Sequence, residues 1–249
     1  MRWHDTPPAP LSPSALHVWR VRLDAGSEDD AIPLLSPVER EQRQSLALPD
    51  LRRRYAIAHG MLRDILSRYV LHPPASLAFA TGEFGKPRLA TPAASDIHFN
   101  LAHSGDVALV AVARGRAVGV DVERWTDRFR PAELAPRVFS LAECRALNEL
   151  SPASQVVEAF FAAWTRKEAY MKATGHGITR GFAHFDVTLE PGRPARLLAD
   201  RLDEAASAHW VMHALDVGPG FSAAVVAEAP VDEVLLMDAA AAGALSGWP

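Results

Sequence analysis

Six consecutive residues, Val118 to Glu123, alternate valine with glycine or a carboxylate. A β-strand turns successive side chains to opposite faces, so a strand here would bury its three valines. Asp121 and Glu123 would then lie together on the other face. The pattern therefore predicts a strand with one apolar face and one carboxylate face.

A second stretch, from Trp164 to Lys172, has helical spacing instead. Trp164, Glu168 and Lys172 stand at i, i+4 and i+8, so they lie along one stripe of a helix. If this helix meets the strand at 118–123, three carboxylates converge beside one lysine. Magnesium prefers oxygen ligands and is usually held by one or two carboxylates plus substrate phosphates. The two stretches together therefore suit a magnesium ion that holds a diphosphate.

Each stretch alone also has an ordinary interpretation, because an Asp-x-Glu pair is usually a solvated strand face and Glu-Lys pairs at i, i+4 are common on helices. Three further segments accompany them: an arginine-rich helix from Arg52 to Arg63, Gly85-Lys86-Pro87, and Phe99-Asn100-Leu101-Ala102-His103-Ser104-Gly105. In this combination and order, the chain resembles the 4'-phosphopantetheinyl transferases of the larger, surfactin-synthetase-activating type. The resemblance extends from about residue 36 to residue 177.

Composition sets the remaining limits. The 249 residues allow one large domain or two small ones, and 49% apolar with 22% charged residues is ordinary for a globular chain. A formal net charge of −4 argues against nucleic-acid binding. Cys144 is the only cysteine, which excludes an intrachain disulfide and fits a reducing compartment. No signal-like segment begins the chain and no apolar run approaches the ~20 residues of a membrane helix, so we expect a cytoplasmic protein without a membrane partner.

The first half of the chain is expected to follow a proline-rich mobile leader at residues 1–14. Interleaved apolar residues predict an opening strand from Leu16 to Leu23. An apolar period of 3.6 residues predicts a helix that starts at Pro49-Asp50 and stops at His72-Pro73-Pro74. Three strands, at 97–102, 107–113 and 117–123, follow, and the turns between them predict an antiparallel meander.

The second half is expected to repeat this order. Ser140 with Glu143 forms a capping-box pattern for a short helix, Ser151-Pro152 opens a longer one, and Gly175 is a natural C-terminal cap. Strands are expected at 182–189, 209–216 and 221–227, and the alanine-rich tail at 231–249 is uninformative. The predicted fold class is α+β, with two pseudo-symmetric halves at 15–124 and 125–249. Each half is a three-stranded antiparallel sheet packed on a long helix, which the resemblance also implies.

The resemblance assigns roles to the residues of the two motifs. It implies that Asp121, Glu123 and Glu168 are magnesium ligands. Glu168 would also act as, or position, the base that deprotonates an attacking serine hydroxyl, unless a metal-bound water does so. Lys172 would stabilise or protonate the departing phosphate.

Coenzyme A carries a 3'-phosphate besides its diphosphate, which calls for cationic side chains. The positions that match phosphate contacts of the family are Arg40 or Arg43, Arg54, Lys86 and His103. Lys167 lies about 100° around the helix from Glu168, so it either touches a phosphate oxygen or faces only solvent. Trp164 either packs in the core or lines the cofactor pocket.

Two positions depart from the family pattern. Ala102 stands where serine is common, which removes one hydroxyl contact to phosphate and weakens binding without changing the reaction class. His176 stands where lysine is frequent, and a histidine is only partly charged at neutral pH.

The resemblance implies an enzyme that transfers the 4'-phosphopantetheine arm of coenzyme A to a serine of an apo acyl or peptidyl carrier protein, releasing adenosine 3',5'-bisphosphate. Magnesium would be the cofactor and coenzyme A the co-substrate, and a monomer would suffice because both parts of the site lie in one chain. Two alternatives stay open: a magnesium-dependent phosphohydrolase that uses water, and a catalytically silent homologue that binds coenzyme A or a carrier. The joint presence of Asp121, Glu123, Glu168 and Lys172 argues against the silent protein.

Overall fold

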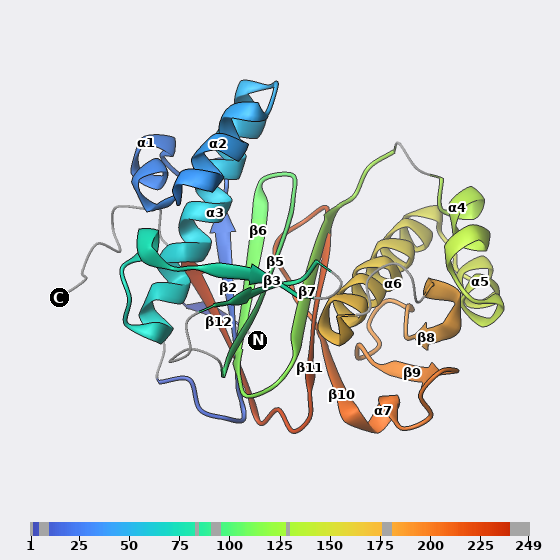
Figure 1. Ribbon diagram of the computed structural model, residues 1–249. Helices are drawn as coiled ribbons and strands as arrows, with labels where there is room; N and C mark the ends of the chain where they lie inside the picture. Colours follow the sequence, from blue (N-terminus) through green and yellow to red (C-terminus); the bar gives the residue numbers. More distant parts are fainter. Residues whose placement is uncertain are drawn as a thin grey trace.

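The computed structural model describes residues 2–4, 10–82, 85–90, 96–127, 130–175 and 181–239 (Figure 1). The helices are α1 (Glu28–Ala31), α2 (Pro37–Ser45), α3 (Pro49–Val70), α4 (Pro131–Val138), α5 (Leu141–Asn148), α6 (Ala153–Thr174) and α7 (Ala206–His209). The strands are β1 (Trp3–His4), β2 (Ala15–Arg22), β3 (Phe79–Thr81), β4 (Pro87–Leu89), β5 (Ile97–Ser104), β6 (Val107–Arg114), β7 (Val118–Arg124), β8 (Phe185–Val187), β9 (Leu197–Asp200), β10 (Trp210–Ala214), β11 (Phe221–Glu228) and β12 (Glu233–Ala239). Within these ranges, no helix is both long and apolar enough to cross a bilayer.

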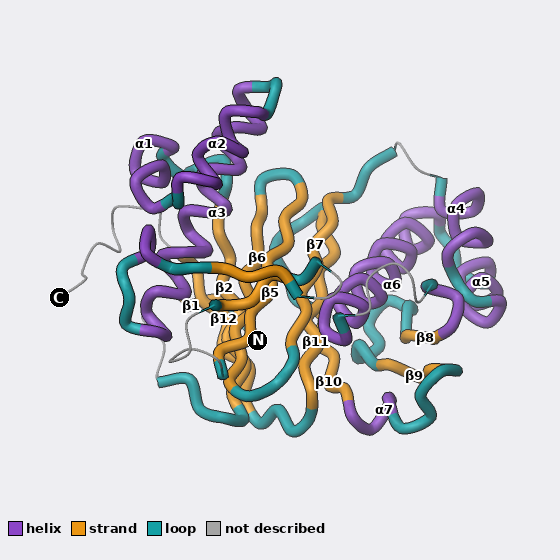
Figure 2. Tube along the Cα trace, in the orientation of Figure 1, coloured by secondary structure: helices purple, strands orange, loops and turns teal. Residues whose placement is uncertain are grey.

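Two larger sheets form the centre of the molecule, which confirms the α+β class (Figure 2). One sheet has five strands in the order β1-β12-β2-β6-β5, and the other has three in the order β10-β11-β7. Two small hairpins, β3-β4 and β8-β9, lie outside them. The expected strands at the start of the chain and at 221–227 are present as β2 and β11.

The layers run from helix to sheet to sheet to helix. The core on the outer face of the five-stranded sheet contains residues of α3, such as Ile57 and Ile65, and of β6, such as Val110. The two sheets pack face to face through a second core, and α6 covers the outer face of the three-stranded sheet through a third. In Figure 1, α3 and α6 accordingly stand on opposite sides of the paired sheets.

Burial on both faces explains the most apolar strands. In β6, Val110 and Val112 face the α3 core, whereas Leu109 and Ala111 face the core between the sheets. Such a strand loses the usual alternation of apolar and polar residues because neither face meets water. In β7, Val118, Val120 and Val122 belong to the core between the sheets, so Asp121 and Glu123 lie on the opposite face, as predicted.

Strand pairing differs from the predicted meander. β5 and β6 pair as expected, but β7 pairs with β11, and Asp121 lies opposite Ala224. The physical reason is that β6 already has β2 and β5 on its two edges, so it has no edge left for β7. The chain crosses from one sheet to the other at Gly115, and the expected division at residue 124 does not coincide with the boundary between the sheets.

The tail contributes a strand that the sequence did not predict. β12 lies beside β2 in parallel, with Leu236 opposite Val18, and β1 adds to its other edge. β1 itself belongs to the stretch expected to be a mobile leader. Arg20 of β2 and Asp238 of β12 join these two strands by an ion pair of 2.7 Å. The five-stranded sheet is therefore built from both ends of the described chain.

Local signals predicted the helix ends well. α3 runs from Pro49 to Val70, and the long helix α6 ends at Gly175, whose φ of 72° is the left-handed conformation that glycine accommodates. Ser140 and Glu143 form the expected capping box at the start of α5. Each of these signals acts over a few residues, so the wider fold does not override it.

Strand β7 and helix α6 meet without any side chain between them at Gly119. A β-carbon on Gly119 would overlap the Ala169 carbonyl oxygen and the Ala173 amide nitrogen, and would lie 2.9 Å from the Lys172 carbonyl carbon. All three atoms belong to the helix backbone, which cannot rotate away as a flexible side chain can. Glycine at this position therefore sets the distance between strand and helix.

A buried ion pair joins α6 to the outer elements of the second half. The ammonium of Lys167 lies 2.8 Å from the Glu143 carboxylate, and the side chains are 0% and 3% exposed. Lys167 also donates to the carbonyl oxygens of Phe182 and Phe185. Glu143 accepts from the backbone amides of Ser140 and Val187. The pair thus fixes α5, α6 and β8 to one another.

We expect Gly119→Ala to lower the free energy of unfolding by about 3 kcal/mol or more, because the helix must move away from the strand. Gly115→Ala is the control, since its φ of 65° strains a side chain but no described atom lies within 4 Å. Strain alone costs about 1–2 kcal/mol. Urea denaturation of both variants measures the difference, and equal losses would contradict the close contact.

We expect Lys167→Met to cost about 3–5 kcal/mol, because it leaves the Glu143 carboxylate buried without its cation. Adding Glu143→Gln removes the stranded charge and should restore part of the loss. A double-mutant cycle by urea denaturation measures this coupling. Additive effects of the two substitutions would show that the pair does not act as a unit.

Candidate functional site

The predicted strand and helix motifs meet at an ion pair between β7 and α6. Asp121 Oδ1 accepts a hydrogen bond of 2.6 Å from the Lys172 ammonium. Asp121 is 4% exposed, whereas the Lys172 side chain is 31% exposed. The contact at Gly119 places these two side chains together, because it brings the last turns of α6 directly against β7.

Two further carboxylates act on this pair. Burial raises the pKa of Asp121 to about 7, the Lys172 charge opposes the rise, and the negative charges of Glu123 and Glu168 add to it. Burial also raises the pKa of Glu168, with Lys172 opposing and Glu123 adding. Glu123 accepts a hydrogen bond of 2.8 Å from the Ser104 hydroxyl at the end of β5. Asp121 and Glu168 therefore share the Lys172 ammonium, and Glu123 adds a third negative charge beside them.

The donor set is chemically suited to a hard divalent cation. Asp121 Oδ2 is buried and has no hydrogen-bond partner among the described residues. A buried carboxylate oxygen without a partner is costly, and a cation would satisfy it. The carboxylates of Glu123 and Glu168 supply further oxygen ligands nearby. Within the described ranges, however, no three acidic, histidine or cysteine side chains are already gathered closely enough to enclose an ion.

Cationic groups border the carboxylates on the side of β5 and α3. Partial desolvation lowers the pKa of His103, and the positive charges of His59, Lys172 and Arg54 lower it further. These groups thus stand near one another and repel an additional proton. His59 was not predicted, although its stacking on Tyr55, with ring centroids 4.0 Å apart, follows helical i, i+4 spacing. An anionic ligand beside His103 would relieve this repulsion.

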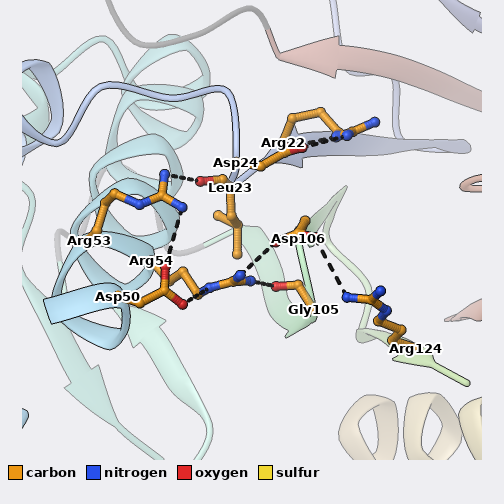
Figure 3. A network of polar contacts seen from close by, with 9 residues as sticks. All are labelled: Arg22, Leu23, Asp24, Asp50, Arg53, Arg54, Gly105, Asp106 and Arg124. Atoms are coloured by element: carbon orange, nitrogen blue, oxygen red, sulfur yellow. Dashed lines mark hydrogen bonds and ion pairs between the residues drawn. The ribbon is translucent and has the colours of Figure 1, made fainter. Parts of the chain in front are cut away.

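Arg54 lies in a polar network that connects α3 to the β5–β6 turn (Figure 3). Its guanidinium pairs with Asp50 and with Asp106, each at 2.6 Å, and donates to the Gly105 carbonyl oxygen. Arg124, at the end of β7, approaches Asp106 at 3.8 Å. The network fixes the turn that follows His103, and any phosphate at Arg54 must share the guanidinium with two carboxylates.

Lys86 comes close to the site but points at backbone. Its ammonium donates to the carbonyl oxygens of Val118 at 2.8 Å and Lys172 at 2.7 Å, and more weakly to Ala173. Burial lowers the pKa of Lys86 to about 8. In this arrangement Lys86 ties β7 to the last turn of α6 and has no ammonium proton left for a phosphate.

Arg40 and Arg43 make contacts within the first helices. Arg40 donates to the carbonyl oxygens of Ile32 and Pro33, and Arg43 pairs with Glu28. Arg40 is exposed, so its weak backbone contacts leave it accessible. The partners of both arginines thus lie in the segment before α2.

Lys167 and Trp164 both contact Phe182 from α6. Lys167 is fully buried against Glu143, so the expectation that it faces solvent is wrong. Its ammonium pairs with the Glu143 carboxylate and donates a hydrogen bond to the Phe182 carbonyl oxygen. Trp164 is half-buried, lies 6.1 Å from Phe160 and meets Phe182 edge-on at 5.4 Å between ring centroids. His176 lies outside the described residues.

Other residues that shape the site carried weak sequence signals. Ser104 belongs to a quoted motif, yet only the structure shows that its hydroxyl binds Glu123 and accepts from the Arg124 amide. Asn100 of the same motif accepts a hydrogen bond from the Val120 amide through its side-chain oxygen. The motif thus connects β5 to β7, although these strands do not pair.

Comparisons with known proteins agree with this arrangement. The model of the 4'-phosphopantetheinyl transferase superfamily matches residues 117–227, which begin one residue before β7 and include α6. The chain is 36% identical to the 4'-phosphopantetheinyl transferase HetI of Nostoc sp. over 199 residues, which cover 78% of this chain and 83% of that protein. It is 30% identical to a 4'-phosphopantetheinyl transferase of Bacillus subtilis over 68% of this chain and 72% of the relative. The transferase Sfp of Bacillus subtilis strain 168 is 27% identical over 79% and 83%. The chain therefore belongs to the 4'-phosphopantetheinyl transferase family.

Proposed function

We propose that the protein transfers the 4'-phosphopantetheine arm of coenzyme A to a serine of an apo carrier protein and releases adenosine 3',5'-bisphosphate. The family supports the reaction, and the pairing of Asp121 with Lys172 beside two more carboxylates is the observation that carries it. Phosphoryl transfer of this kind depends mainly on positioning and charge neutralisation. The site offers acids on one side and cations on the other, which suits a bound diphosphate.

In this proposal, each side chain has a distinct task. The serine oxygen attacks the β-phosphorus on the pantetheine side, and Lys172 stabilises the charge that builds on the departing phosphate. Glu168, whose pKa is raised, serves as or orients the base for the serine proton. Magnesium, held by Asp121, Glu123 and Glu168, would neutralise the diphosphate.

We propose that His103 and Arg54 contact the phosphates of coenzyme A, with His59 beside them and Arg40 or Arg43 farther along α2. The mutual repulsion of the cations around His103 supports an anionic ligand there. We leave out Lys167, because its ammonium is buried against Glu143, and Lys86, because it holds backbone carbonyls. Trp164 stays a candidate for the pocket wall through its half-buried ring.

We also propose that the two halves are pseudo-symmetric and that one monomer, located in the cytoplasm, forms the complete site. The support is the element order, in which a strand, three helices, a hairpin and two strands occur from β2 to β6 and again from β7 to β11, with α7 as an addition. The strand orders β2-β6-β5 and β7-β11-β10 correspond as well. This division places the boundary before β7 and not after it.

Incubation with coenzyme A, magnesium and an apo carrier protein, followed by intact-mass measurement, tests the proposed reaction. We expect the carrier to gain one phosphopantetheine arm and adenosine 3',5'-bisphosphate to appear in equal amount. Bisphosphate formed without carrier would instead indicate hydrolysis. Binding of coenzyme A without any product would indicate a silent protein.

Substitutions should separate metal binding from leaving-group stabilisation. Asp121→Ala should raise the magnesium concentration for half-maximal rate, because it removes a proposed ligand. Lys172→Ala should lower kcat and kcat/KM by similar factors, on the order of a hundredfold or 3 kcal/mol, with little change in magnesium dependence.

Steady-state kinetics over a magnesium series measures both effects, with unchanged circular dichroism required of each variant. Arg145→Ala, which changes an exposed residue on α5, is the control. A raised KM for coenzyme A with intact kcat in Lys172→Ala would make the lysine a ground-state binding residue and would contradict the proposed role.

A further inference from the structure

A cavity of about 830 Å³ lies on the side of α6 away from the carboxylates of the proposed active site. Its walls are α6 at Glu158, Ala162 and Arg166, the segment 189–197, and strand β10. Arg166 and Glu168 are two positions apart, which places them about 200° apart around the helix. The residues that line the cavity include none of the proposed catalytic or metal-binding side chains. The cavity is therefore a separate site.

Arg166 places an unpaired positive charge at the wall of this cavity. The residue is 6% exposed, and no carboxylate among the described residues forms an ion pair with it. Burial lowers the pKa of Arg166 only to about 10, so the guanidinium is charged at neutral pH. A buried charge is normally paired, because its lost hydration must be replaced. The nearby Glu190 already pairs with Arg193 at 3.1 Å.

The free edge of the guanidinium matches a planar anion. Nη1 donates to the carbonyl oxygen and the hydroxyl of Thr188, which fixes the orientation of the side chain. Nε and Nη2 donate no hydrogen bond to a described residue, and these two atoms form one edge of the arginine fork. Two parallel N–H groups on one edge bind the two oxygens of a carboxylate in a bidentate manner.

The remaining walls suit an apolar body attached to that anion. Leu189, Leu197, Met212 and Trp210 line the cavity. Its volume lies within the range of about 300–1,000 Å³ that small-molecule sites occupy. The exposed Arg193 and Arg196 and the carboxylates of Glu158 and Glu190 also line the cavity, so Arg166 is its buried cation. Apolar walls with a few oriented polar groups are common in sites for small organic ligands.

We propose that this cavity binds a small organic acid, whose carboxylate pairs with the Nε and Nη2 edge of Arg166 and whose apolar part packs against Trp210. The ligand contacts the same helix that carries Glu168 and Lys172 on its other side.

Titration calorimetry at constant ionic strength, with benzoate and with inorganic phosphate as probes, tests this site. We expect benzoate to bind the wild-type protein and Arg166→Met to weaken that binding on the order of tenfold or more. His103→Ala is the control, because it removes a proposed phosphate contact from the coenzyme A site, and it should leave benzoate affinity unchanged. Benzoate binding that depends on His103 and not on Arg166, or no benzoate binding at all, would overturn the proposal.

Phosphate distinguishes the class of anion. Binding of phosphate through Arg166 without binding of benzoate would overturn the assignment to a carboxylate.

If Arg166→Met does not fold, the wild-type protein still decides the question by nuclear magnetic resonance. Benzoate in the cavity must shift the indole N–H signal of Trp210, identified by its loss in Trp210→Phe, and an unmoved signal at saturating benzoate would contradict the site.

Discussion

The fold and the proposed site both depend on the direct contact of β7 with α6 at Gly119. With no side chain between them, the strand and the helix backbone approach as closely as their own atoms allow. Asp121 lies two residues from Gly119, and its partner Lys172 contributes backbone to the contact itself. The Lys86 ammonium holds the same junction through the Val118 and Lys172 carbonyls. A larger residue at position 119 would change the distance between acid and base as well as the packing.

The helix motif is long because its residues serve opposite sides of one helix. Glu168 and Lys172 face the carboxylates of β7, whereas Lys167 and Arg166 face the outer elements of the second half. Tyr170 adds a hydrogen bond of 2.7 Å to Asp200 of β9. The side chains that face away from β7 hold the helix in register, so that the two that face it reach their partners. In this motif, residues proposed to take part in the reaction stand next to residues that hold the helix in place.

The sequence predicted those features whose signals lie within a few neighbouring residues. The ends of α3 and α6, the capping box at Ser140 and the two faces of β7 all follow from periodicity within a few residues. Which strands pair was not predictable in the same way, because it depends on which edges other strands already occupy, as with β6. The sequence likewise did not indicate where a long cationic side chain would point. Lys86 meets carbonyl groups 32 and 86 residues away, and no spacing within its own motif indicates that.

The parallel pairing of β12 with β2 has a consequence for how the molecule forms. The ion pair between Arg20 and Asp238 spans 218 positions of the chain. The N-terminal strands leave the ribosome first, so one edge of β2 stays unpaired until nearly all of the second half has been synthesised. Closing a loop of this length before the strands gain their contacts slows assembly, and the uncovered edge is open to pairing with other chains. β12, the last strand of the described residues, is thus the one that covers the free edge of β2.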